Sequence, residues 1–327
     1  MRALFLLALL STLALAPLAE ARTVIDITDP EGDDRGPGYY GYPGNAVFKP
    51  GVFDLVRFQV VDEGASLAFR LTFKDLGGNP WGGPNGFCLQ HVHVYVRTTQ
   101  AGLARMDSLG LNIAFPSSHA WHFAIIVAPG WEEKVVPAGQ RAGIYFYSEA
   151  MTQDGDMTVS VEGNSIIVRV RKTKLIDTEN VDKWTITVAL ASYDGFGPAR
   201  VRPAGPTGGE WVLNGTRFAT PEQRGRIAKA IAEGMEPRVM DLAMYSPTVK
   251  GIDAATQFRW LDSFDVDTKR LAQVPFAPVE RTITVEKTLE KQVTLTETKT
   301  ETNWPISIGL LIVGLAVGFL VARFLLK

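Results

Sequence analysis

The hydrophobic pattern of the chain is typical of short β-strands. Apolar residues either alternate with polar ones or form short continuous runs, and stretches rich in glycine and proline separate these segments. Many short strands with glycine-rich turns favour a sandwich, so the predicted fold class is all-β. The runs that we interpret as strands are Val24–Ile27, Leu55–Val61, Ser66–Phe73, Phe87–Arg97, Phe123–Val127, Gly143–Tyr147, Thr158–Val161, Ser165–Val170 and Trp184–Ala191.

One helix is predicted inside this β-rich body. The segment Thr220–Gln223 (TPEQ) combines a capping hydroxyl, a proline at the first helical position and a glutamine at the third. Ile227, Ala228 and Ile231 then fall on one face, and Gly234 is a suitable stop. We expect this helix to be an insertion that lies against the sandwich.

Both ends of the chain are hydrophobic. Residues 1–21 have an early arginine, an apolar stretch and the small-x-small sequence Ala19–Ala21, which together predict a secretory signal peptide. A second membrane helix is the alternative for this segment. Residues 305–327 contain roughly 20 apolar residues, enough to span a bilayer. Their ionisable groups, Arg323 and Lys327, lie at the far end, so we expect a cytoplasmic C-terminus and an extracellular domain.

The segment before this anchor has a different composition. Residues 279–304 are rich in Thr, Glu and Lys, which predicts an extended stalk that reaches about 80 Å. Val285, Leu289 and Val293 recur every four residues, so a short self-associating helix is the alternative. The expected organisation is therefore a signal peptide (1–21), a β-sandwich binding domain (22–278), a stalk (279–304) and a membrane anchor (305–327).

Charge and cysteine content narrow the classes of function. The net charge is −2 with no basic block, which argues against a nucleic-acid partner. Cys88 is the single cysteine, so an internal disulfide is excluded. A secreted domain without disulfides needs a substantial core, a bound metal or both. Because Cys88 lies in an apolar run, we expect it to be packed in the core.

Several segments resemble the C-terminal binding module of glucodextranase. The longest are Asp29–Gly38 (DPEGDDRGPG), Phe48–Leu55 (FKPGVFDL) and Phe73–Phe87 (FKDLGGNPWGGPNGF). Tyr42-Pro43 lies between the first two of these segments and also matches. Weaker matches run through Ala120-Trp121, Pro129–Trp131, Asp194–Pro198, Asp241-Leu242 and Val274-Pro275. The resemblance covers about Val24 to Phe276.

This resemblance implies a β-sandwich similar to family-nine carbohydrate-binding modules. Such modules accompany starch- and dextran-degrading enzymes at cell surfaces and have been likened to surface-layer attachment modules. The resemblance covers the module and not the catalytic domains that usually precede it, so we expect no direct hydrolysis. The expected protein is therefore a membrane-tethered binding module and not an enzyme.

An acidic loop is the candidate metal site. Asp29, Glu31, Asp33 and Asp34 lie within six residues beside glycines, and carboxylates this close repel one another without a cation or water between them. Oxygen ligands on a bent loop suit Ca²⁺, and we expect Asp29, Asp33 and Asp34 to be the donors. The alternative is a solvated acidic turn.

Aromatic side chains are the candidate carbohydrate contacts, because flat rings cover the C–H faces of sugars. Tyr40, Tyr42, Trp81 and Trp131 lie in or next to loops rich in glycine or proline. We expect Trp81 and Tyr40 to be exposed and Trp121 to belong to the core. Packing in loops or the core is the alternative for each ring.

Other chemistry is less well supported. His91 and His93 share a face of a predicted strand, and His119 and His122 lie farther along the chain, so a zinc or copper site is one hypothesis. Haem bound through Met106 and a histidine is another. The Gly-x-Ser-x-Gly elbow and a phosphate-binding glycine loop are absent. Asp262, Asp265 and Asp267 are a candidate cluster for the paired carboxylates of glycoside hydrolysis, but a solvated face or a second ion site is favoured.

The sequence is compatible with three functions. The first is a membrane-anchored extracellular protein that binds α-glucan or an envelope polysaccharide without catalysis. The second is a structural envelope protein that docks to a surface layer or a partner enzyme. The third is an enzyme or redox protein on the same scaffold. The sequence favours the first.

Overall fold

The structure is a computed structural model that describes residues 20–131, 142–147 and 149–275. The predicted stalk and membrane anchor, and all but the last two residues of the predicted signal peptide, lie outside these ranges. Within the described ranges, no helix has the length and apolar character needed to cross a membrane.

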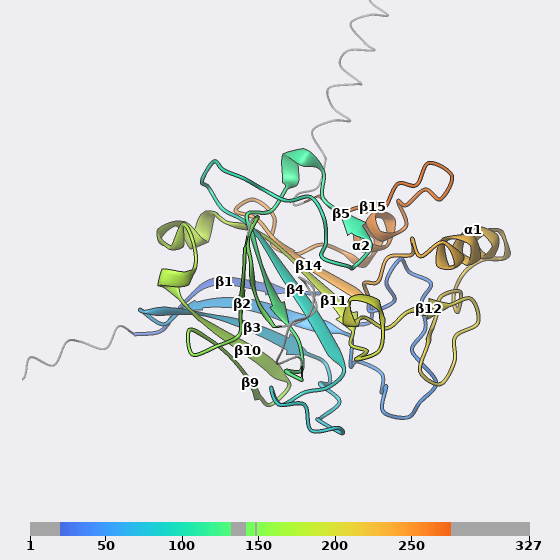
Figure 1. The fold of residues 1–327 in the computed structure, drawn as a ribbon, viewed down its shortest axis with the longest axis horizontal. Coiled ribbons are helices and arrows are strands. Elements are labelled where there is room, and N and C mark those ends of the chain that lie inside the picture. Colours follow the sequence, from blue (N-terminus) through green and yellow to red (C-terminus); the bar gives the residue numbers. More distant parts are fainter. Residues whose placement is uncertain (1–19, 132–141, 148, 276–327) are drawn as a thin grey trace, which may run out of the picture. The chain divides into compact units, whose positions relative to one another are not determined.

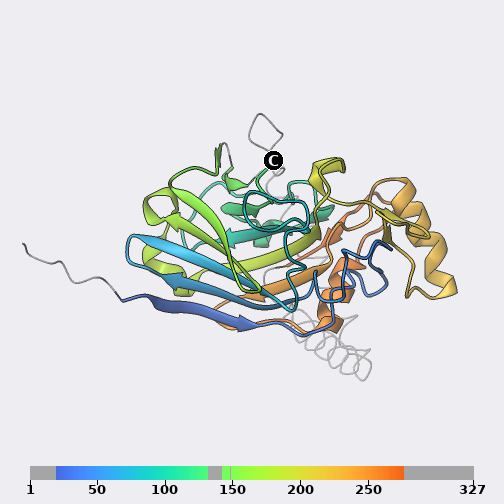
Figure 2. The same cartoon turned by 90° about the horizontal axis from the view of Figure 1, so that it is seen from below.

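Two antiparallel sheets form a sandwich (Figures 1 and 2). The five-stranded sheet has the order β1 (Arg22–Thr28), β2 (Leu55–Asp62), β3 (Ser66–Phe73), β10 (Ser165–Arg171) and β9 (Met157–Glu162). The six-stranded sheet has the order β14 (Asp241–Tyr245), β11 (Thr185–Ser192), β4 (Gln90–Arg97), β6 (Phe123–Val127), β7 (Gly143–Tyr145) and β8 (Ala150–Thr152). Every run predicted as a strand overlaps one of these strands, so the all-β prediction is confirmed.

The main core lies between the two sheets. Phe58 of β2 and Phe69 of β3 face this core together with Val94 of β4, and all three are 0% exposed. On β4 the intervening residues point the other way, because side chains alternate across a strand. Tyr95 belongs to a second core on the outer face of the six-stranded sheet, where Trp121 also packs. This sheet is therefore covered on both faces.

The outer face of the five-stranded sheet is polar. Arg57 on β2 forms a two-point ion pair with Asp26 on β1, with N–O distances of 2.8 and 2.6 Å. Arg70 on β3 likewise pairs with Glu162 on β9 at 2.8 Å. The alternation along these strands thus separates a buried apolar face from a solvated charged one.

Helix α1 (Pro221–Ala232) begins as predicted. Thr220 and Gln223 form a reciprocal capping box, and Gly234, just after the helix, has a φ of 66°. The prediction of a single helix is wrong, because α2 (Ala254–Leu261) follows. The Asp253 side chain caps α2 by accepting from the Thr256 N–H at 2.7 Å.

Smaller elements complete the described chain. The parallel pairs are β12 (Ala204–Gly205) with β13 (Leu213–Asn214), and β15 (Ala272–Gln273) with β5 (Ile113–Ala114). Short 3₁₀ turns span Ser117–His119, Lys172–Lys174, Thr178–Lys183 and Pro198–Arg200. Helix α1 contacts β12, and both lie at the end of the sandwich that appears on the right in Figure 1.

Strand register brings several loops to one end of the sandwich. The end of β3 lies opposite the start of β2, and the end of β6 lies near the start of β4. Gln90 at the start of β4 also pairs with Ser192 at the end of β11. Asp241 at the start of β14 pairs with Leu190, two residues before the end of β11. The loops that leave these strand ends carry both the acidic residues and the exposed tryptophans described next.

Candidate functional site

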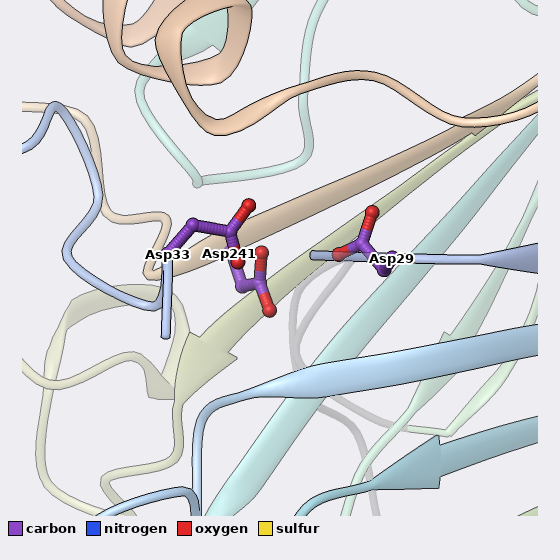
Figure 3. Close-up of side chains that lie close together, drawn as sticks. All are labelled: Asp29, Asp33 and Asp241. Carbon is purple, nitrogen blue, oxygen red and sulfur yellow. The ribbon is translucent and has the colours of Figure 1, made fainter. Parts of the chain in front are cut away.

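Three aspartates from separate segments meet at this end (Figure 3). Asp29 directly follows β1, Asp33 lies in the next turn, and Asp241 opens β14. One carboxylate oxygen from each lies within 4.8 Å of the other two. Calcium–oxygen distances are about 2.3–2.6 Å, so oxygens at this spacing can share one ion.

The three carboxylates are buried. Asp29 is 6% exposed, Asp33 is 2% exposed and Asp241 is 0% exposed. Asp241 is oriented by the backbone, since its two oxygens accept from the N–H groups of Leu55 at 2.7 Å and Leu242 at 2.8 Å. Both carboxylate oxygens of Asp29 and of Asp33 are buried without a hydrogen-bond partner. Buried oxygens in this state are costly unless a cation binds them or they are protonated.

Two further aspartates border this group. Asp54, 1% exposed, accepts from the Gly32 N–H at 2.9 Å, and its Oδ2 lies 3.9 Å from the Lys74 Nζ. Asp34, which we expected among the metal donors, lies outside the group of three, and its Oδ2 accepts from the Tyr42 hydroxyl. Asp241 takes the third place instead.

The cluster is electrostatically strained. Burial, reinforced by the charge of Asp54, raises the pKa of Asp33 to about 7. Burial and the neighbouring Asp34 raise the pKa of Asp54 to about 6. The pKa values of Asp29 and Asp241 are also well above the ordinary range, first through burial and then through the other carboxylates. A divalent cation bound here would offset this repulsion.

In protein stripped of divalent cations, stability should fall as pH rises from about 4 to about 7. A raised pKa means that the folded state holds more protons than the unfolded state in this window, so deprotonation favours unfolding. We expect the melting temperature to drop by roughly 5 °C between pH 5 and pH 7.5. A melting temperature that is constant or rises over this range would contradict the raised pKa values.

A pocket of about 680 Å³ is lined in part by the two bordering aspartates, Asp34 and Asp54. Its lining includes Asp34, Asp54, Lys74, Tyr40, Tyr42 and Phe48. The pocket is thus bordered by both carboxylates and aromatic rings, as binding sites for polar ligands often are.

The expected exposure of Tyr40 is wrong. Tyr40 is 1% exposed, and its hydroxyl donates to the Pro237 carbonyl at 2.8 Å. Tyr42 is partly buried, and its hydroxyl accepts from the N–H groups of Gly51 at 3.3 Å and Phe53 at 3.2 Å. Their glycine-rich loop folds back onto the sandwich, so these rings support the wall of the pocket.

Trp81 is exposed as predicted, with 44% of its surface accessible. The Asn79 side chain holds its loop by donating to the Gly83 carbonyl at 2.9 Å and accepting from the Gly83 N–H at 2.7 Å. The backbone N–H of Trp81 donates to the sulfur of Cys88, and Cys88 is buried as expected. Trp81 is therefore presented on a loop that is already fixed.

Trp211 lies beside Trp81, although nothing in the sequence analysis selected it. It is 42% exposed, and the two ring centroids are 6.0 Å apart with the planes tilted by 54°. Phe48 packs against Trp211 in a T-shaped arrangement, with the ring centroids 5.9 Å apart. Like Trp81, Trp211 follows a run of glycines, and this composition was the signal that could have found it.

Trp131 is also partly exposed, at 39%, and packs against Tyr193 with the centroids 5.6 Å apart. The Asn85 N–H donates to the Pro129 carbonyl at 2.9 Å, which fastens the Trp81 loop to the segment that carries Trp131. Trp121 is 0% exposed and lies in the second core, as predicted.

The histidines do not assemble a metal site in the described part of the chain. His91 and His93 do share one face of β4, and both are buried. The His93 Nδ1 bonds to the Tyr95 hydroxyl at 2.8 Å, whereas the His122 Nδ1 accepts from the Thr98 N–H at 3.0 Å. Among the described residues, the group of three aspartates is the one set of His, Cys, Asp or Glu side chains spaced for a metal ion.

The acidic residues near α2 behave as a solvated face. Asp262 pairs with Arg226 at 2.5 Å, and Asp267 pairs with Lys229 at 2.6 Å. Asp265 accepts from the N–H of Asp267 at 3.0 Å and therefore shapes its own turn.

Comparison with known proteins identifies the scaffold on which these features lie. A sequence model of the C-terminal binding module of glucodextranase, described as SLH-like, matches residues 24–276. The chain belongs to this family. No curated protein matches it. The match covers both sheets, the aspartates and the tryptophans, and it describes a glucodextranase binding module and not a catalytic domain. The predicted resemblance is therefore confirmed.

Proposed function

We propose that this protein binds carbohydrate without catalysis, and that α-glucan or an envelope polysaccharide lies on Trp81 and Trp211. The observation that carries this proposal is the paired, partly exposed indole rings 6.0 Å apart at the loop end of the sandwich. Membership of a family of glucodextranase binding modules also supports carbohydrate binding.

The rings supply the main interaction. An exposed indole offers a rigid apolar face to the C–H groups of a pyranose, and little side-chain entropy is lost on binding. The tilt of 54° between the planes gives two faces that are not coplanar, which suits a chain that twists between successive sugars. We expect dissociation constants between millimolar and micromolar, about −4 to −8 kcal/mol.

Calcium is the cofactor that we propose for the aspartate cluster. The donors are Asp29, Asp33 and Asp241, which provide only carboxylate oxygens, and hard oxygen ligands suit Ca²⁺. The partnerless oxygens of Asp29 and Asp33 support a bound cation. The ion would fix the loop between β1 and β2, whose residues also line the pocket.

We further propose an extracellular location. The support is the sequence, which predicts a signal peptide at 1–21, a stalk at 279–304 and a C-terminal membrane anchor at 305–327. This arrangement would hold the module outside the cell, where Ca²⁺ and polysaccharides are available. The second candidate partner is a surface-layer component, which the SLH-like description of the family favours.

Affinity electrophoresis tests the proposed function. The full chain, in detergent with calcium, is run through native gels that contain soluble starch, dextran or isolated envelope polysaccharide. We expect slower migration in at least one of these gels than in a gel without polysaccharide. Equal migration in all gels would contradict carbohydrate binding.

A further inference from the structure

A second aromatic surface lies next to the proposed Trp81–Trp211 site. Trp131 is 39% exposed and is backed by Tyr193, and Phe196 in the following turn is fully exposed, at 102%. A tightly bonded turn presents Phe196, since the Asp194 side chain accepts from the Phe196 N–H at 2.9 Å and the Asp194 carbonyl accepts from the Gly197 N–H at 3.0 Å. An ordered turn that leaves a phenyl ring in water is suited to contact a ligand.

Arg202 joins the two surfaces. Arg202 is 5% exposed, and its guanidinium donates to the Trp211 carbonyl at 2.6 Å and to the Tyr193 carbonyl at 2.9 Å. The guanidinium carbon also lies 4.8 Å from the centre of the Phe48 ring. The rigid, planar guanidinium of Arg202 therefore bonds to the backbone at both Trp211 and Tyr193. These bonds fix the distance between the two segments that carry the aromatic surfaces.

A second connection comes from Asn85. Its Nδ2 donates to the Ala128 carbonyl at 2.8 Å, and this residue is 7% exposed. The Trp81 loop is thus bonded to the end of β6 just before Trp131. The two aromatic surfaces are held together from two directions, so they can bind one ligand without rearranging.

We propose that the ligand is a polysaccharide chain long enough to span two subsites, with Trp131 and Phe196 as a second subsite beside Trp81 and Trp211. This inference rests on the proposed function and specifies its substrate class. Two fixed aromatic surfaces contact more sugar units than one, so affinity should increase with the length of the chain.

The test is calorimetric titration of the full chain with maltooligosaccharides and isomaltooligosaccharides of two to seven glucose units. We expect the affinity of the unmodified protein to rise with length. Trp131→Ala and Phe196→Ala should leave binding of the shortest detectable ligand within about twofold. They should weaken binding of the longest ligand by about tenfold, the loss expected for an aromatic contact of about 1.4 kcal/mol.

The possible failures are distinguishable. If the unmodified protein binds with an affinity that does not depend on length, or if both variants match it at every length, the second subsite is wrong and the proposed function stands. If the unmodified protein binds no oligosaccharide or polysaccharide, both proposals fail together. Phe196 is fully exposed, so Phe196→Ala gives a result even if Trp131→Ala disturbs folding.

Discussion

Replacing Trp81 and Trp211 together with alanine is expected to lower affinity for the retained polysaccharide by about a hundredfold. Each indole is partly exposed and held on a fixed loop, so its stacking energy is available to a ligand. Buried aromatic contacts at binding sites are often worth about 2 kcal/mol, and each 1.4 kcal/mol is a factor of ten. Each single replacement should therefore cost about tenfold or more, measured by affinity electrophoresis over a range of polysaccharide concentrations.

Tyr147→Ala is the matched control for these variants. Tyr147 is an exposed aromatic residue, at 51%, but it follows β7 at the opposite end of the sandwich. We expect this variant to bind as the unmodified protein does. Because Trp81 and Trp211 are 44% and 42% exposed, their replacement should change the melting temperature little. Full retention by a folded Trp81→Ala/Trp211→Ala variant would remove these rings from the site.

Removing calcium is expected to lower the melting temperature by roughly 5–10 °C at neutral pH. A ligand at a hundred times its dissociation constant stabilises the folded state by about 2.7 kcal/mol, and 1 kcal/mol corresponds to about 2–4 °C for a domain of this size. The loss should be larger at pH 7.5 than at pH 5, because the carboxylates are then more fully charged. Differential scanning calorimetry with calcium and after chelation measures both effects.

Asp33→Asn separates loss of a ligand from loss of the fold. The Asp33 carboxylate makes no hydrogen bond in the cluster, so asparagine removes one charge and leaves the backbone bonds of the turn in place. We expect this variant to lose the calcium-dependent gain in melting temperature and yet to equal or exceed the unmodified protein after chelation. Asp267→Asn, on an exposed side chain, should keep the full calcium response. A calcium response that survives in Asp33→Asn would contradict the proposed donors.

The sequence predicts the sandwich well because the strands carry local signals. Alternation along β2 and β3 and the continuous apolar run of β6 identify strands without knowledge of their partners. Helix α1 was equally predictable from its capping box. Helix α2 was missed although Asp253 is a good cap, because its eight residues are too short for a clear periodic pattern.

The site was predictable only in part, because long-range contacts assemble it. Asp29 and Asp33 were selected from a local acidic loop, whereas Asp241 joins them through the pairing of β14 with β11. Trp81 was selected for its glycine-rich loop, but its neighbour Trp211 comes from a distant segment. Tyr40 was misplaced because the local composition does not show that its loop folds back onto the sandwich. Local chemistry thus indicated the kind of site, and the fold determined its members.

The most direct test is a crystal structure of the protein with calcium and the oligosaccharide that binds best. It should show sugar rings stacked on Trp81 and Trp211, and a cation within about 2.3–2.6 Å of oxygens from Asp29, Asp33 and Asp241. A sugar bound away from these tryptophans would contradict the proposed binding surface. An aspartate cluster with no cation, in crystals grown with excess calcium, would contradict the proposed ion site.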